Sequence, residues 1–130
     1  MNAPTATITD KGDYLIVTEI GERTSLLDIV EDVKTVYEAA KAYDNKYLLV
    51  DFHQVNNIVP QTDAFNLVRI FESKFPDLSD LTFSYITNDE SLQLVKFWEH
   101  ISNQRGFKIK VFTNFDEAQN WLISEITKVA

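Results

Sequence analysis

The chain has 130 residues, of which 45% are hydrophobic and 25% charged, so it has the size and composition of one globular domain. Its formal net charge of -8 argues against nucleic-acid binding, which needs clustered Lys and Arg side chains to displace counterions from phosphates. The absence of cysteine from the sequence excludes disulfide frameworks, thiolate metal sites and cysteine nucleophiles.

The first residues, MNAPTATITD, have neither the basic nor the apolar segment of a signal peptide. No apolar run approaches the roughly 18 residues that a membrane span needs. We therefore expect a cytoplasmic protein without a membrane span.

The first half of the chain predicts a hairpin and then a helix. Ala6 to Ile20 predicts two strands around the turn DKGD, where Gly12 can adopt a positive φ. Gly21 to Thr24 is predicted to end the second strand. The segment SLLDIVEDVKTVYEAAKAY then predicts a helix with Ser25 as its N-cap. Its apolar face is expected to hold Leu26, Val30, Val33, Tyr37 and Ala40.

A strand and a second helix are predicted next. KYLLVDF is a nearly continuous apolar run, typical of a central strand covered on both faces, and we expect this strand to end at Phe52. QTDAFNLVRIFESKF predicts a helix with Thr62 as its N-cap. Pro76 is expected to end that helix, because proline disfavours helical backbone in the residue before it.

The last third of the chain continues the alternation. LTFSYIT predicts a strand, and ESLQLVKFWEHISNQRG predicts a helix stopped by Gly106. FKIKVF predicts the last strand. The last helix begins within TNFDEAQNWL, where Thr113 or Asn114 can cap it.

The predicted element order is therefore β-β-α-β-α-β-α-β-α. Strands that alternate with helices imply right-handed crossovers and a mainly parallel sheet. The opening hairpin makes the sheet mixed and places its first strand at an edge. We expect a single α/β domain over residues 1–130, with about five strands and four helices.

The polar segment after the central strand is the first place to look for a site, because ligands of open α/β sheets bind at the carboxyl ends of the strands. The candidates for binding a partner or ligand are His53, Asn56 and Asn57 in this segment, and Thr62 and Phe65 at the start of the helix that follows it. An enzyme with a site near Asp51 and His53 is an alternative. The sequence has no Gly-rich nucleophile elbow, phosphate-binding loop or metal-ligand motif, so we expect no catalytic residue, cofactor or metal.

Some apolar residues fall outside the main apolar face of their helices, namely Phe65, Ile70, Phe97 and Ile123. They are either buried by neighbouring elements or form an exposed patch that a partner covers. A protein partner, a second copy of the chain and a small apolar ligand all remain open as the occupant of such a patch.

The element order, the central YLLVDF and the ending KVFTNFDEAQNWL resemble the STAS domain, the sulfate-transporter and anti-sigma-factor-antagonist family. The resemblance is strongest to the stand-alone, SpoIIAA-like bacterial branch and extends from about Thr7 to Leu122. Its most suggestive phrase is F-x-x-x-x-x-A-x-x-W-L, from Phe112 to Leu122. It implies a mixed sheet with helices and a non-enzymatic regulatory module that acts through protein contacts or binds a small apolar ligand.

The resemblance also implies a candidate phosphoacceptor. The best-known members bind a kinase-like anti-sigma factor and are switched by phosphorylation of a serine at the start of the second helix, in a D-S-S-G-L pattern. In this chain the hydroxyl falls on Thr62, with Pro60 in place of the Asp and Asp63 in place of the Gly. Because Asp63 puts a like charge where phosphate would arrive, we expect Thr62 to serve as a helix cap.

Overall fold

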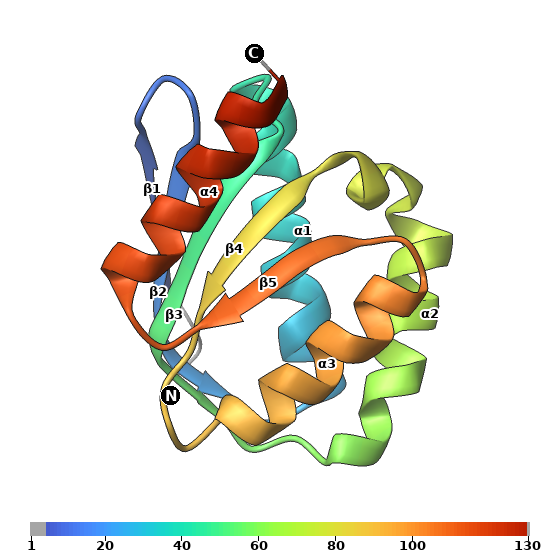
Figure 1. Cartoon of the computed structure of the whole chain (residues 1–130). Helices are drawn as coiled ribbons and strands as arrows, with labels where there is room; N and C mark the ends of the chain where they lie inside the picture. Colours follow the sequence, from blue (N-terminus) through green and yellow to red (C-terminus); the bar gives the residue numbers. More distant parts are fainter. Residues whose placement is uncertain (1–4, 130) are drawn as a thin grey trace.

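A computed structural model describes residues 5–129 as one mixed sheet with helices against both faces (Figure 1). The strands are β1 (Thr5–Asp10), β2 (Leu15–Arg23), β3 (Tyr47–Asn57), β4 (Thr82–Ile86) and β5 (Lys108–Phe112). The helices are α1 (Leu26–Ala42), α2 (Ala64–Lys74), α3 (Leu92–Gln104) and α4 (Phe115–Val129), with the short 3-10 helices η1 (Gln61–Asp63) and η2 (Pro76–Asp80) on either side of α2. Within residues 5–129, none of the helices has the length and apolar character needed to cross a membrane.

The strands lie side by side in the order β1-β2-β3-β4-β5, so the predicted central strand is the middle one. β1 runs antiparallel to β2, and the other three neighbouring pairs are parallel. This confirms the mixed, mainly parallel sheet with the first strand at an edge. Since β2 to β5 run in one direction, the loops that follow them meet at one end of the molecule, which we call the carboxyl end of the sheet.

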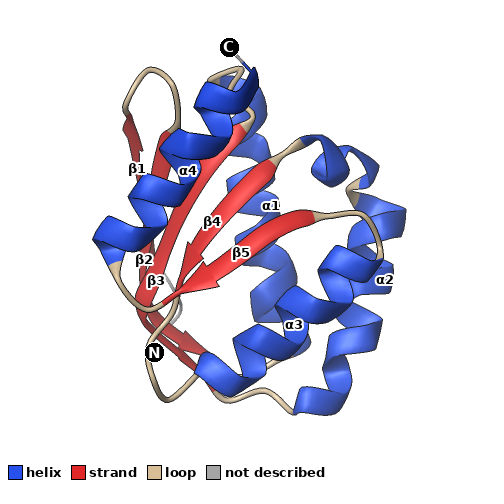
Figure 2. Cartoon of the chain, viewed as in Figure 1, coloured by secondary structure: helices blue, strands red, loops and turns tan. Residues whose placement is uncertain are grey.

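Side chains on the two faces of the sheet belong to separate cores. Leu48 and Val50 of β3 belong to the larger core, which also holds residues of α1, α2 and α3. Leu49 between them belongs to the smaller core, which holds Ala118 and Leu122 of α4. Figure 2 shows α4 in front of the sheet and α1 behind it. The run of apolar residues in β3 is therefore explained by burial on both faces.

Two of the predicted helix caps are confirmed. The hydroxyl oxygen of Ser25 accepts a hydrogen bond from the backbone amide of Asp28, at 3.3 Å. The side-chain oxygen of Asn114 accepts one from the backbone amide of Glu117, at 3.0 Å. Each bond satisfies an amide that has no partner within the first turn of its helix.

The prediction that Thr62 caps the second helix was wrong. Thr62 lies inside η1, and neither η1 nor α2 has a side-chain capping hydrogen bond. The chain instead enters α2 through a 3-10 turn, in which the amide of Asp63 donates to the carbonyl of Pro60 at 3.1 Å. The amide of Ala64, which a cap at Thr62 could have satisfied, donates instead to the carbonyl of Gln61.

β2 and β3 both extend further than predicted. Gly21 to Thr24 was expected to end β2, yet the strand continues to Arg23, and β3 continues beyond Phe52 to Asn57. β3 also contains a bulge. The pairs Thr18–Asp51 and Ile20–Gln54 enclose one residue of β2 but two of β3.

The bulge explains why the sequence pattern ended the strand too early. Phe52 and Val55 both lie in the larger core although they are three residues apart, which breaks the two-residue alternation of a regular strand. The segment from His53 to Asn57, expected to be a surface loop, is therefore the second half of the central strand.

Candidate functional site

Several large apolar side chains are exposed at the carboxyl end of the sheet, and three of them lie on the segments that follow β2 and β3. Leu27 in the first turn of α1 is 66% exposed, Ile58 after β3 is 62% exposed, and Phe65 in the first turn of α2 is 56% exposed. The backbone amide of Ile58 donates to the carbonyl of Arg23 at 2.7 Å, which holds the loop after β3 beside the segment that leads into α1. We call Leu27, Ile58 and Phe65 the apolar end patch.

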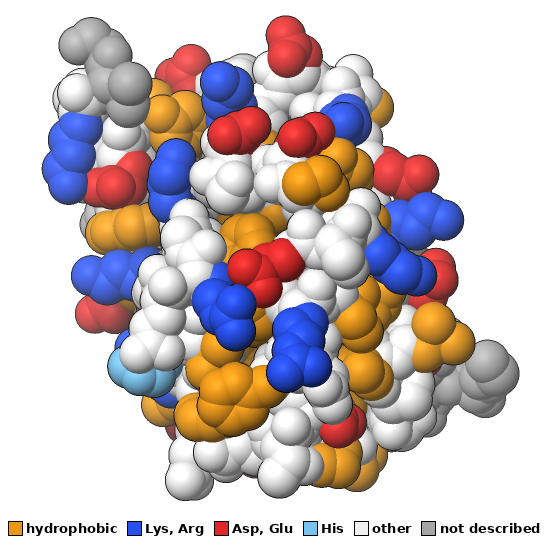
Figure 3. Space-filling model, turned by 90° about the vertical axis from the view of Figure 1, so that its right-hand side faces the viewer, with side chains coloured by type: hydrophobic (Ala, Val, Ile, Leu, Met, Phe, Trp, Pro, Cys, Tyr) orange, Lys and Arg blue, Asp and Glu red, His pale blue; other side chains and the backbone are white. Residues whose placement is uncertain are grey.

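The structure decides the alternative left open for the four apolar residues outside the main helix faces. Phe65 and Ile123 are exposed, whereas Ile70 and Phe97 are partly buried. Phe65 contacts Phe97 of α3 edge to face, with ring centroids 5.9 Å apart. Figure 3 views the side of the molecule that carries α2 and α3, where hydrophobic side chains reach the surface between charged ones. The ring of Phe65 is therefore held in place by its contact with Phe97 but remains exposed to solvent.

The polar candidates after the central strand lie at this same end. His53 and Asn56 are exposed, whereas Asn57 is partly buried and donates from its side-chain amide to the hydroxyl of Ser91, at 3.3 Å. The side-chain amide of Asn88 donates to the carbonyls of His53, at 2.9 Å, and Val55, at 3.2 Å. These bonds fasten the second half of β3 to the turn before α3, so Asn57 has a structural contact while Asn56 is available at the surface.

Asp51 and His53 contact each other directly. Oδ1 of Asp51 lies 2.5 Å from Nδ1 of His53 and also accepts a hydrogen bond from the backbone amide of His53, at 3.3 Å. The side chain of His53 is 50% exposed and that of Asp51 only 12%. Asp51 was expected at the end of the strand, but it lies inside β3 because the strand continues past it. With Nδ1 engaged, Nε2 is the ring nitrogen available for proton transfer.

Thr62 is exposed in the turn before α2. Its hydroxyl makes no capping hydrogen bond to η1 or α2, and the residue after it is Asp63. The position is accessible from solvent and lies close in the chain to Phe65.

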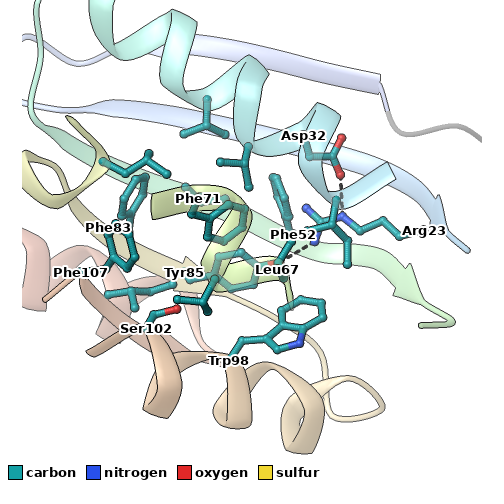
Figure 4. Close-up of a pocket in the computed structure, with 17 residues that line it drawn as sticks. Arg23, Asp32, Phe52, Leu67, Phe71, Phe83, Tyr85, Trp98, Ser102 and Phe107 are labelled. Atoms are coloured by element: carbon teal, nitrogen blue, oxygen red, sulfur yellow. Dashed lines mark hydrogen bonds and ion pairs between the residues drawn. The ribbon is translucent and has the colours of Figure 1, made fainter. Parts of the chain in front are cut away.

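A buried ionic cluster lies between the end of β2 and α1, and it was not predicted. The side chain of Arg23 is 2% exposed, and its Nε donates to Oδ2 of Asp32 on α1, at 2.5 Å. Its Nη1 donates to the hydroxyl of Tyr85 at 3.4 Å, and its guanidinium carbon lies 4.6 Å from the centre of the Phe52 ring. Figure 4 shows these groups turned toward one another. Pairing and hydrogen bonding of this kind are what make a buried charge tolerable.

Glu19, also buried, belongs to the same cluster. Burial, together with a hydrogen bond to Asp32 and the negative charge of Asp32, raises the pKa of Glu19 from its ordinary value of 4.5 to about 8. Burial also raises the pKa of Tyr85. Because the pKa of Glu19 lies above neutral pH, Glu19 holds its proton beside the pair of Arg23 and Asp32.

A sequence signal for this cluster existed. If YLIVTEIGER is read as one strand, the alternation that buries Leu15 and Val17 on the α1 face continues to Glu19 and then to Arg23. On the facing helix, α1, Asp32 follows the buried Ile29 by three residues and precedes the buried Val36 by four. Acidic and basic residues at positions that face one core predict a buried pair.

The fold is similar to that of two solved structures. An anti-sigma factor antagonist from Mycobacterium paratuberculosis matches with a TM-score of 0.60 and 12% identity, covering 92% of this chain and 93% of that one. An uncharacterized protein of the DUF3478 family with a SpoIIAA-like fold, from Shewanella loihica PV-4, matches with a TM-score of 0.57 and 14% identity, covering 94% and 95%. No family model and no curated protein matches the chain. The likeness confirms the SpoIIAA-like fold that the resemblance implied.

Proposed function

We propose that this chain, which has the SpoIIAA-like fold, is a non-enzymatic regulatory module that binds another protein at the carboxyl end of its sheet. The observation that carries the proposal is the exposure of the apolar end patch, Leu27, Ile58 and Phe65. Large apolar side chains held in water by three separate segments form a surface that a partner can cover. The similar structure from Mycobacterium paratuberculosis is described as an antagonist of an anti-sigma factor, which supports a protein as the partner.

The charge around the apolar end patch narrows the chemistry of the partner. Asp89 and Glu90 are exposed in the turn before α3, Asp63 precedes α2, and the whole chain carries a net charge of -8. The complementary surface combines apolar residues with Lys and Arg. A second copy of this chain would bring the same negative charge and is disfavoured by repulsion.

Substitution of the apolar end patch tests this proposal. A partner is first captured from the source cells with the tagged chain, then purified, and its affinity is measured by calorimetry. We expect Ile58→Ser and Phe65→Ser each to weaken binding by about tenfold, because each removes a large apolar contact. Tyr43→Ser is the matched control, since Tyr43 is 47% exposed but follows the far end of α1. Equal affinity in all three variants would overturn the proposal.

Self-association of the chain is a rival to binding of another protein, and sedimentation of the same variants distinguishes the two. If the wild-type chain sediments as a dimer and Phe65→Ser as a monomer, the partner is a second copy.

The phosphorylation switch implied by the resemblance is tested by incubating wild type and Thr62→Ala with a cognate kinase and measuring intact mass. A mass increase of wild type alone supports that switch, and an unchanged mass of both proteins removes it.

A second candidate function is proton-transfer catalysis at Asp51 and His53, because their contact fixes the imidazole ring at a half-exposed position. Hydrolysis of p-nitrophenyl acetate by wild type, His53→Gln and His100→Gln tests it. His100 is the only other histidine and lies exposed on α3, so it controls for unassisted imidazole chemistry. We expect similar rates for both variants, as a non-enzymatic module requires. A rate lost in His53→Gln alone would favour the catalytic candidate.

A further inference from the structure

A cavity of about 100 Å³ lies within the larger core, enclosed by side chains from the sheet and from α1, α2 and α3 (Figure 4). α2 packs mainly against its neighbouring helices, α1 and α3, rather than directly on the strands. The side chains beneath it leave space unfilled, whereas most protein interiors have few voids larger than a water molecule. The aromatic and aliphatic part of the wall includes Phe52, Leu67, Phe71, Phe83, Trp98 and Phe107.

The cavity reaches toward solvent near the beginning of β4. Phe71, Phe83 and Ile109 line it and are only partly buried, although all three pack against the larger core. Phe83 and Ile109 are register partners on β4 and β5. β4 has a neighbouring strand on each side, so Phe83 is exposed at a face of the sheet and not at its edge. A small molecule can enter the cavity from this face.

Three of the polar side chains that line the cavity, those of Arg23, Asp32 and Tyr85, are bonded to one another. Arg23 pairs with Asp32 and donates to Tyr85, and its guanidinium lies over the ring of Phe52. The indole nitrogen of Trp98 is buried without a hydrogen-bond partner among the described residues, and it is turned away from the other side chains that surround the cavity (Figure 4). A charged molecule that entered would lose its hydration without gaining an unpaired partner from this cluster.

We infer that this cavity binds one small uncharged hydrocarbon-like molecule, a single aromatic or alicyclic ring. Cavities with apolar walls stay dry, and one of about 150 Å³ lined by Leu, Ile and Phe takes up benzene. The present cavity is somewhat smaller and has similar walls, so one ring of about six carbon atoms is the size it accommodates. This site is separate from the apolar end patch, and its occupation does not depend on a protein partner.

Titration of the full chain with benzene, followed by backbone amide chemical shifts, tests the inference. We expect saturable shifts at residues that line the cavity, such as Leu67 and Phe83. Val33→Phe puts a ring into the cavity from α1 and is expected to weaken benzene binding by about tenfold or more. Val30→Phe is the matched control, because Val30 is also a partly buried valine of α1 but does not line the cavity. It should bind benzene as wild type does.

A second pair of variants is used if Val33→Phe does not fold, which a missing cooperative unfolding transition would reveal. Phe71→Trp enlarges a side chain of the cavity wall, and Phe97→Trp makes the same change at a partly buried position outside it. Weaker benzene binding in Phe71→Trp alone supports the site. Absence of saturable shifts in wild type, or equal binding in all variants, identifies a packing void only and overturns the inference. Tighter binding of benzoate than of benzene would also overturn it, since the ligand would then be an anion.

Discussion

Replacement of Arg23 by methionine is expected to lower the free energy of unfolding by about 3–5 kcal/mol, which makes it one of the two most damaging changes we foresee. The substitution keeps much of the side-chain volume but leaves the Asp32 carboxylate buried without its positive partner. It also removes the donor to the Tyr85 hydroxyl and the cation above the Phe52 ring. Urea unfolding at pH 7 measures the loss.

A double variant and a surface control identify the cause. Arg23→Met combined with Asp32→Leu replaces the pair by apolar side chains and should recover most of the stability, because no uncompensated charge remains. Lys41→Met breaks an ion pair with Asp77 at 3.3 Å in which both side chains are 58% exposed, and it should have little effect on stability because solvent screens the pair. If Arg23→Met costs no more than Lys41→Met, the buried pair is not stabilising the fold.

The stability of the wild-type chain is expected to fall as the pH rises from about 4.5 to about 8, because of Glu19. The pKa of Glu19 is about 8 in the folded chain, against an ordinary value of 4.5, so the folded state holds this proton over a range in which the unfolded state has released it. The contribution to stability is complete below pH 4.5 and is lost as the pH approaches 8. The loss is on the order of 3 to 5 kcal/mol.

Glu19→Gln isolates this effect, since the amide is neutral at every pH and keeps the size of the protonated acid. We expect the difference in unfolding free energy between Glu19→Gln and wild type to change steadily across this range, in favour of the variant as the pH rises. Glu38→Gln on the exposed side of α1 should show no such change. Parallel stability curves for wild type and Glu19→Gln between pH 5 and pH 8 would contradict a protonated Glu19.

The sequence predicted the architecture well because local patterns determined most of it. The alternating strands and helices, the middle position of β3 and the caps at Ser25 and Asn114 follow from residue periodicity and from side-chain oxygens near helix starts. The second halves of β2 and β3 could not be read in this way. Most of their residues are polar, and they are strands because each is the other's hydrogen-bonded neighbour, from Gly21 beside Val55 to Arg23 beside Asn57.

The site was predicted in part. The carboxyl end of the sheet follows from topology, and Phe65 was identified because it falls outside the apolar face of its helix. Its exposure depends on how far α3 extends beside it, which no local pattern specifies. The cluster of Arg23, Asp32 and Glu19 was missed because Gly21 to Thr24 was expected to end the strand, so Arg23 was not placed on the face that packs against α1. The cavity results from the position of α2 relative to its neighbours, which depends on tertiary packing.

The bulge in β3 has a consequence for how this chain can vary in sequence. In a regular strand, side chains alternate between the two faces. A different set of side chains can therefore face the interior only if the whole strand shifts by one residue along its neighbour. One additional residue opposite Glu19 inverts the alternation for the rest of β3, while pairing with β2 resumes at Gln54. Val55 then anchors the strand in the core, and Gln54 and Asn56 on either side of it face solvent. Substitutions at those two positions can therefore adapt the surface to different partners while the interior stays unchanged.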